Sequence, residues 1–185
     1  MNMVIILIFL NKGVMTMKKN RWLIALSAIA IHLSIGGAYA YSVYKLPIVE
    51  EMGWTATQVT IAFTIMMALA GTSAAFFGSF VEKNGPRKSA MLAAVLFGLG
   101  QAGSGVAIAI DSVILYWLTY GLLSGLGMGL GYISPVSTLV KWFPDRRGLA
   151  TGMAVLGFGA GALITAPVAA SLMESVGIST TYYLL

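Results

Sequence analysis

The 185-residue sequence contains no cysteine and a single histidine, and these absences exclude several kinds of site. Without cysteine there is no disulfide framework, no thiol nucleophile and no cysteine-based metal centre. One imidazole cannot build a zinc site that needs several. The chain also lacks a Gly-x-x-x-x-Gly-Lys nucleotide loop and a nucleophile placed beside a base. We therefore expect no enzymatic activity, no metal and no cofactor.

Charge is scarce as well. Only 9% of the residues are charged, 58% are hydrophobic, and the mean hydropathy is +0.89. Soluble domains carry roughly 25% charged residues because water must wet their surfaces. The net charge of +5 does not indicate a nucleic-acid partner, since the basic residues fall between apolar blocks instead of forming one face. The composition predicts that the lipid bilayer is the main partner.

Long stretches without Asp, Glu, Lys or Arg predict an all-α membrane protein. Each stretch exceeds the roughly 20 residues that a helix needs to cross the hydrocarbon layer. Only a helix satisfies its own backbone there, and the continuous apolar runs lack the alternation of a membrane barrel. We expect a sixth helix to begin near residue 180. The five complete helices are predicted at 22–44, 59–81, 89–110, 113–140 and 149–173.

The beginning of the chain differs from the rest. The apolar run 4–10 is too short to span a membrane, and no basic residue precedes it. We interpret 1–16 as a mis-called or non-native extension and 17–185 as the N-terminal transmembrane half of a larger protein whose C-terminal half is missing. A signal peptide is the weaker alternative, because no small-residue cleavage site follows the run.

The connecting segments predict the orientation. If the helices alternate in direction, ten of the eleven basic residues fall on one side, and Lys45 lies on the other side with four carboxylates. Basic loops stay in the cytoplasm, so we expect a cytoplasmic N-terminus in the inner or plasma membrane. The ten are Lys12, Lys18, Lys19, Arg21, Lys83, Arg87, Lys88, Lys141, Arg146 and Arg147.

Small residues at four-residue spacing predict close helix contacts. Apolar side chains are as stable in lipid as between helices, so membrane helices associate through close packing, which small residues allow. Three glycine stripes have this spacing: Gly121, Gly125 and Gly129; Gly127 and Gly131; and Gly157 and Gly161. A weaker stripe consists of Gly71, Ala75 and Ser79.

The segment 78–88, GSFVEKNGPRK, resembles the loop motif of the major facilitator superfamily. Gly78 allows a neighbouring helix to approach, Gly85 turns the chain, and Arg87 and Lys88 anchor it inside. The family usually has Asp where this chain has Glu82, so the charge is retained on a longer side chain.

A second segment, 141–152 (KWFPDRRGLATG), is similar to a loop of the oxalate/formate antiporter family and its monocarboxylate-carrier relatives. Here Asp145 lies near a helix N-terminus, where negative charge is favoured, and Gly148 and Gly152 permit tight packing. The stretch 36–44, GGAYAYSVY, is similar to the first helix of the same family.

The resemblance implies two six-helix halves with the substrate held between them, and alternating access to the two sides of the membrane. This chain is then the N-terminal half of a secondary carrier of small organic anions, mono- or dicarboxylates such as oxalate and formate. Two alternatives stay open: a non-transporting membrane remnant that at most associates with other helices, and a major facilitator carrier of an unrelated substrate.

Four residues are candidates for substrate binding. His32 is the only ionisable side chain within a predicted span, so it is either a ligand or proton site, or a neutral imidazole bonded between helices. Tyr39 lies two turns further on the same face. Tyr120 and Tyr132 offer hydroxyl donors on the fourth span. The outer-interface position of Tyr41, Tyr44 and Trp54 predicts membrane-anchoring roles instead.

The two cytoplasmic loops are predicted to form an inner gate. We expect a charge network of Glu82, Arg87, Asp145 and Arg147, since single surface ion pairs contribute only about 0–1 kcal/mol. The remaining gate candidates are the loop residues Gly78, Gly85, Lys88, Arg146 and Gly148.

Overall fold

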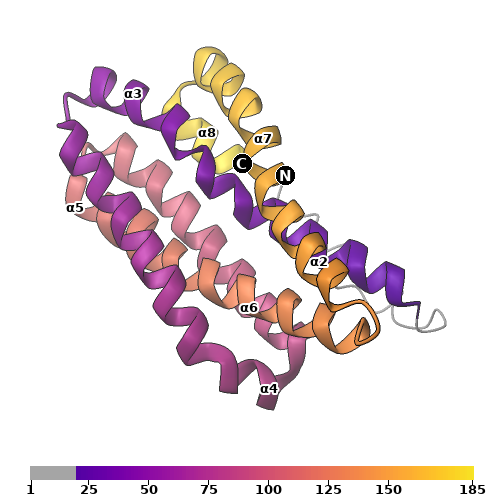
Figure 1. Ribbon diagram of the computed structural model, residues 1–185. Helices are drawn as coiled ribbons and strands as arrows, with labels where there is room; N and C mark the ends of the chain where they lie inside the picture. The colour runs from indigo at the N-terminus through magenta and orange to yellow at the C-terminus, as the bar shows by residue number, and fades with distance from the viewer. Residues whose placement is uncertain (1–19) are drawn as a thin grey trace.

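A computed structural model describes residues 20–185, so the predicted extension 1–16 lies outside the described residues. Throughout 20–185 every regular element is helical (Figure 1). The elements are α2 (Arg21–Gly36), the 3₁₀-helix η2 (Gly37–Ala40), α3 (Tyr41–Met52), α4 (Ala56–Ala109), α5 (Val113–Tyr116), the π-helix η3 (Trp117–Leu123), α6 (Ser124–Trp142), α7 (Arg147–Val176) and α8 (Ile178–Leu184).

Within the described residues, four continuous helical stretches are long and apolar enough to cross a membrane. They are Arg21–Met52, Ala56–Ala109, Val113–Trp142 and Arg147–Val176. The all-helical prediction is therefore confirmed, but the predicted count of five complete helices is not, because the predicted helices 59–81 and 89–110 both fall within α4.

Gly85 bends α4 into a hairpin. Its backbone angles, φ 79° and ψ 164°, are not helical, although Gly85 lies inside this 54-residue element. A straight helix of that length spans about 80 Å. Yet Trp54, just before α4, donates its indole N–H to Asp111, just after α4, at 2.6 Å. The two limbs therefore run antiparallel and lie beside α6 (Figure 1). The predicted turn at Gly85 is confirmed, and Pro86 after it suits the first position of the returning limb.

The glycines of α6 let it lie directly on both limbs of α4. A Cβ on Gly125 would come within 2.9 Å of the Met66 carbonyl on the first limb, and one on Gly127 within 2.5 Å of the Phe97 nitrogen on the second. Gly129 of α6 and Gly121 of the preceding η3 also face the first limb closely. The predicted close approach along these α6 stripes is confirmed.

Glycines also join α7 to α2. A Cβ on Gly157 would lie 2.6 Å from the His32 Cβ, one on Gly161 would collide with the Leu33 carbonyl, and one on Gly36 would meet the Phe158 carbonyl. These contacts bring the two backbones together over about two helical turns, as the spacing of Gly157 and Gly161 predicts.

Four glycines do not pack as expected. A Cβ on Gly71, Gly78, Gly148 or Gly152 would meet no described atom within 4 Å, apart from its own surroundings in the helix. No helix among residues 20–185 packs against these four positions, so the packing role expected of them stays a prediction.

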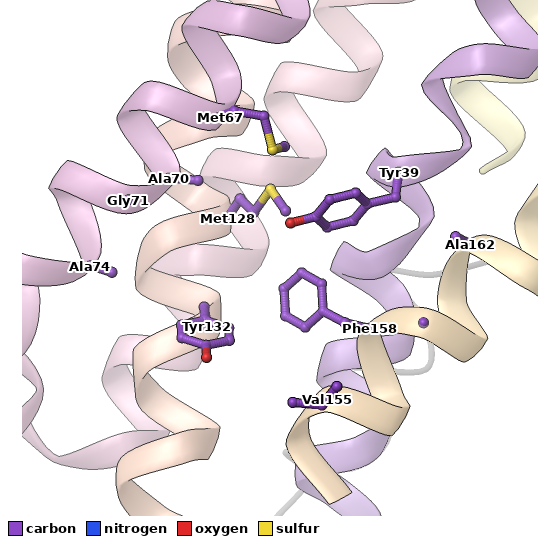
Figure 2. A pocket seen from close by; sticks show the side chains of 11 residues that line it. Tyr39, Met67, Ala70, Gly71, Ala74, Met128, Tyr132, Val155, Phe158 and Ala162 are labelled. Carbon is purple, nitrogen blue, oxygen red and sulfur yellow. The ribbon is translucent and has the colours of Figure 1, made fainter. Parts of the chain in front are cut away.

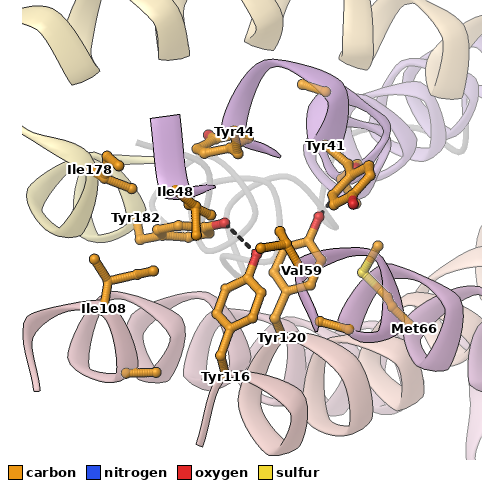
Figure 3. Packing of buried hydrophobic residues seen from close by; sticks show 14 of the residues in the cluster. Tyr41, Tyr44, Ile48, Val59, Met66, Ile108, Tyr116, Tyr120, Ile178 and Tyr182 are labelled. Carbon is orange, nitrogen blue, oxygen red and sulfur yellow. Dashed lines mark hydrogen bonds between the residues drawn. The ribbon is translucent and has the colours of Figure 1, made fainter. Parts of the chain in front are cut away.

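Tyrosines fill the main core, contrary to the interfacial role predicted for Tyr41, Tyr44 and Trp54. All three are buried, with 6–9% of their surface exposed. Tyr41 stacks on Phe63, Tyr44 packs on Tyr182, and Trp54 contacts Tyr116. The hydroxyls of Tyr116 and Tyr182 hydrogen-bond to each other at 2.9 Å (Figure 3). The prediction was wrong because the three rings pack against other aromatic rings of the bundle, and the polar tips of Tyr41 and Trp54 bond to Thr60 and Asp111.

Replacing Gly161 with alanine is expected to destabilise the bundle, because the added methyl collides with the α2 backbone. Overpacking of this kind costs about 1–3 kcal/mol. Gly159→Ala on the same helix is the matched control, since a Cβ there meets nothing within 4 Å. Thermal unfolding in detergent, followed by tryptophan fluorescence, should show a lower midpoint for Gly161→Ala and an unchanged or higher one for Gly159→Ala. Equal midpoints would contradict the close α2–α7 contact.

Candidate functional site

An open cavity of about 710 Å³ lies between η2, the first limb of α4, α6 and α7 (Figure 2). Its volume is in the range typical of small-molecule sites. The lining residues are Tyr39, Met67, Ala70, Gly71, Ala74, Met128, Tyr132, Val155, Phe158, Gly159 and Ala162.

The lining is almost entirely apolar. Among the side chains that the described residues contribute, the polar groups are the hydroxyls of Tyr39 and Tyr132, and no Asp, Glu, Lys, Arg or His is among them. Such a surface can hold the apolar part of a ligand and donate two hydrogen bonds to it. It cannot by itself neutralise an anion.

An aromatic wall, which we define as Tyr39, Tyr132 and Phe158, forms one side of the cavity. Phe158 is its centre: the Tyr39 ring meets it edge-on at 5.8 Å and the Tyr132 ring at 5.4 Å. Tyr39 projects from η2 across the cavity toward Met128 (Figure 2). These edge-to-face contacts each contribute about 0.5–1.5 kcal/mol and fix the ring orientations.

Glycine keeps the cavity open on two sides. Gly71 on α4 and Gly159 on α7 both line it, and a Cβ on either would point into unoccupied space. Gly71 therefore borders the cavity instead of a helix contact.

His32 lies behind the aromatic wall, fully buried, and does not line the cavity. Its Nδ1 is 2.9 Å from the Ala154 carbonyl oxygen on α7, and its Nε2 is 3.3 Å from the Tyr132 carbonyl oxygen on α6. The ring stacks on Tyr132 at 5.5 Å and packs against Phe158 at 4.9 Å. Of the two interpretations, a bond between helices fits the geometry, and direct contact with a ligand in this cavity does not.

The four substrate-binding candidates thus separate into two at the cavity and two away from it. Tyr39 and Tyr132 line it, and their side chains are partly exposed. Tyr120 is 2% exposed, stacks on Tyr116 at 5.1 Å, and donates its hydroxyl to the Ala38 carbonyl at 3.4 Å. It belongs to the core, so the structure does not place it at the cavity. Phe158, which joins the two tyrosines, was missed because its residue type carries no polar signal.

The ion pairs of Asp145 differ from the predicted network. Asp145 pairs with Arg21 at 3.1 Å and lies 3.8 Å from Arg146, and the Arg21 guanidinium lies 5.3 Å above the Phe143 ring. The expected partner Arg147 makes no ion pair with it among the described residues. Sequence reasoning did not select Arg21, because nothing in the linear order places the start of α2 beside the turn before α7.

The other gate candidates lie in the two predicted loops, and their role in a gate stays a prediction. Glu82, Arg87 and Lys88 flank the Gly85 turn between the limbs of α4, and Gly78 lies just before it. Asp145, Arg146, Arg147 and Gly148 lie where α6 has ended and α7 begins.

Long apolar helices packed through glycine around an open cavity define a multi-pass membrane protein. The chain belongs to the Major Facilitator Superfamily, whose family model matches residues 24–185. Members of this family are transporters.

Individual relatives agree with this assignment. The chain is 31% identical over 164 residues to the oxalate:formate antiporter of Oxalobacter formigenes, which covers 88% of this chain and 38% of the relative. It is 28% identical over 165 residues to the uncharacterized MFS-type transporter YhjX of Escherichia coli, covering 89% and 40%. It is 27% identical over 144 residues to mouse monocarboxylate transporter 14, covering 77% and 28%. The chain therefore spans about two fifths of the length of the first two relatives.

Single cysteines can test whether water fills the cavity, because the sequence has no cysteine of its own. Ala162 lines the cavity, the neighbouring Leu163 is 76% exposed outside it, and Ala169 is fully buried. A thiol reacts as the thiolate, which needs water. In lipid nanodiscs, a water-soluble maleimide should modify Ala162→Cys about tenfold faster than Leu163→Cys or Ala169→Cys. Equal rates at Ala162→Cys and Leu163→Cys would mean that the cavity is not hydrated.

Proposed function

We propose that this chain is the N-terminal half of a secondary active transporter that carries small organic anions by alternating access. The observation that carries the proposal is the open cavity between η2, α4, α6 and α7, with two tyrosine hydroxyls in an apolar lining. Membership of a family of transporters and similarity to an oxalate:formate antiporter and a monocarboxylate transporter support it.

The missing charge in the cavity favours a site shared with further helices. An organic anion held in a membrane needs a compensating positive charge, and the described lining offers none. We propose that the chain's apolar wall and hydroxyls contact the body of a mono- or dicarboxylate, and that a C-terminal half supplies the basic groups facing them. The greater length of the relatives supports this division.

We also propose that the chain crosses the membrane five times, that α8 begins a sixth crossing, and that the N-terminus is cytoplasmic in the inner or plasma membrane. The hairpin at Gly85 supports two crossings within α4, because the limbs run antiparallel and each, at about 36–44 Å, is long enough to cross about 30 Å of hydrocarbon. The basic residues around Gly85 and before α7 then share the cytoplasmic side with Arg21.

Labelling of single cysteines tests this topology. Lys83 lies at the α4 turn, and Glu51 lies near the opposite end of the hairpin, where α3 ends; both are exposed. In sealed cells, an impermeant maleimide should modify Glu51→Cys from outside, and should reach Lys83→Cys only after the membrane is opened. Modification of both from the same side would refute the five-crossing arrangement.

Transport itself is tested by uptake of labelled oxalate and formate into proteoliposomes that contain the complete gene product. Ala74→Phe fills the cavity from α4, so uptake should fall about tenfold or more. Ala75→Phe, one position along and not among the lining residues, is the matched control and should keep wild-type uptake. Absence of exchange with either anion would leave a carrier of another substrate or a non-transporting protein.

A further inference from the structure

The surroundings of His32 are unusual for a side chain within a membrane bundle. It is fully buried, and both ring nitrogens face main-chain oxygens on two other helices, Ala154 on α7 and Tyr132 on α6. A carbonyl oxygen only accepts hydrogen bonds. A neutral imidazole has one N–H and can donate to one of the two oxygens, whereas an imidazolium has two and can donate to both. The number of helices that His32 bonds therefore depends on its protonation.

His32 also supports two of the three residues of the aromatic wall. Its ring lies nearly parallel to that of Tyr132, with an interplanar angle of 14°, and it contacts Phe158, which in turn contacts Tyr39. Gly157 lies against the His32 Cβ, and the imidazole ring itself contacts the rings of Tyr132 and Phe158. A change in its bonding is therefore transmitted to the wall.

We infer that His32 is a positioning residue for the cavity, which ties α6 to α2 and α7 when protonated and so makes anion affinity depend on pH. The inference rests on the proposed function, since it concerns regulation of that same site. His32 does not touch the substrate; it acts through Tyr132 and Phe158. Protonation also places a positive charge directly behind a wall that otherwise carries none among the described residues.

In the part of the chain that the structure describes, no other charged side chain is bonded to His32. The elements packed against α2 are α6, α7 and η2. The titratable group that faces His32 from α6 is Tyr132 itself, and η2 contributes Tyr39, whose ring contacts Phe158. The charged residues of α6 and α7 make no ion pair with the imidazole in the described part of the chain. These residues are Lys141, Arg147 and Glu174.

Two variants remove the titratable group in different ways. His32→Asn keeps a donor near the Nδ1 position and cannot titrate, while His32→Phe keeps the ring and loses both donors. In proteoliposomes with the complete gene product, the wild-type KM for labelled oxalate or formate should fall about threefold to tenfold from pH 8 to pH 5.5, with a smaller change in maximal rate. Both variants should show a flat KM. A wild-type pH profile retained in His32→Asn would overturn the inference.

A second measurement needs no substrate. In the complete gene product labelled with nitrogen-15 histidine, the signals that disappear in His32→Asn belong to His32, which is the one histidine of residues 1–185. In nanodiscs, the acid form should show hydrogen bonds from both ring nitrogens, and the neutral form from one. If the Nε2 signal of the acid form showed a nitrogen exposed to water instead of one bonded to a carbonyl oxygen, the inference would be overturned. If the nitrogen signals follow the prediction but wild type takes up neither anion, the proposed function fails while the proton-dependent tie between helices is retained.

Discussion

The bundle depends on main chains that lie in direct contact, above all where α7 crosses α2. In lipid, apolar side chains gain nothing by leaving the hydrocarbon, so helices associate through close packing and hydrogen bonds. Gly157 and Gly161 bring the two backbones so close that a methyl group at either position would collide with α2. This approach carries the Ala154 carbonyl to within 2.9 Å of the His32 ring. One steric fact thus sets both the crossing of two helices and the burial of the chain's only imidazole.

The same crossing shapes the cavity. With α7 held against α2, Phe158 reaches the rings of Tyr39 and Tyr132, which come from η2 and α6, and the three rings close one side of the space. The other sides stay open where Gly71 and Gly159 carry no side chain. Glycine therefore has two opposite uses here: it removes space between helices at some positions and preserves it at others.

Sequence reasoning identified the all-helical membrane class, the turn at Gly85 and the closest glycine contacts, because each follows from local chemistry. Uncharged length predicts a membrane helix, a tight turn favours glycine, and four-residue spacing places small residues on one face. It also selected Tyr39 and Tyr132, both of which line the cavity.

The failures have a common physical cause: what a residue faces depends on the packing of distant helices. Spacing along α4 does not show that Gly71 points into a cavity while the α6 glycines point into contacts. Nor does the order of loops show that Asp145 meets Arg21. Position near the end of a span favoured membrane anchoring for Trp54, yet its indole N–H finds Asp111 across the α4 hairpin.

Tyr120 shows how a buried hydroxyl can serve a site without being in it. It comes from η3, the π-helical stretch before α6, and its hydroxyl donates to the Ala38 carbonyl within η2, the 3₁₀ segment that carries Tyr39. In lipid an unpaired polar group costs several kcal/mol, so irregular backbone persists where a side chain satisfies it. The two departures from regular helix therefore meet, and Tyr120 supports the short segment from which Tyr39 enters the cavity. Tyr120, which the sequence predicts as a substrate-binding residue, thus supports the backbone next to Tyr39, which does line the cavity.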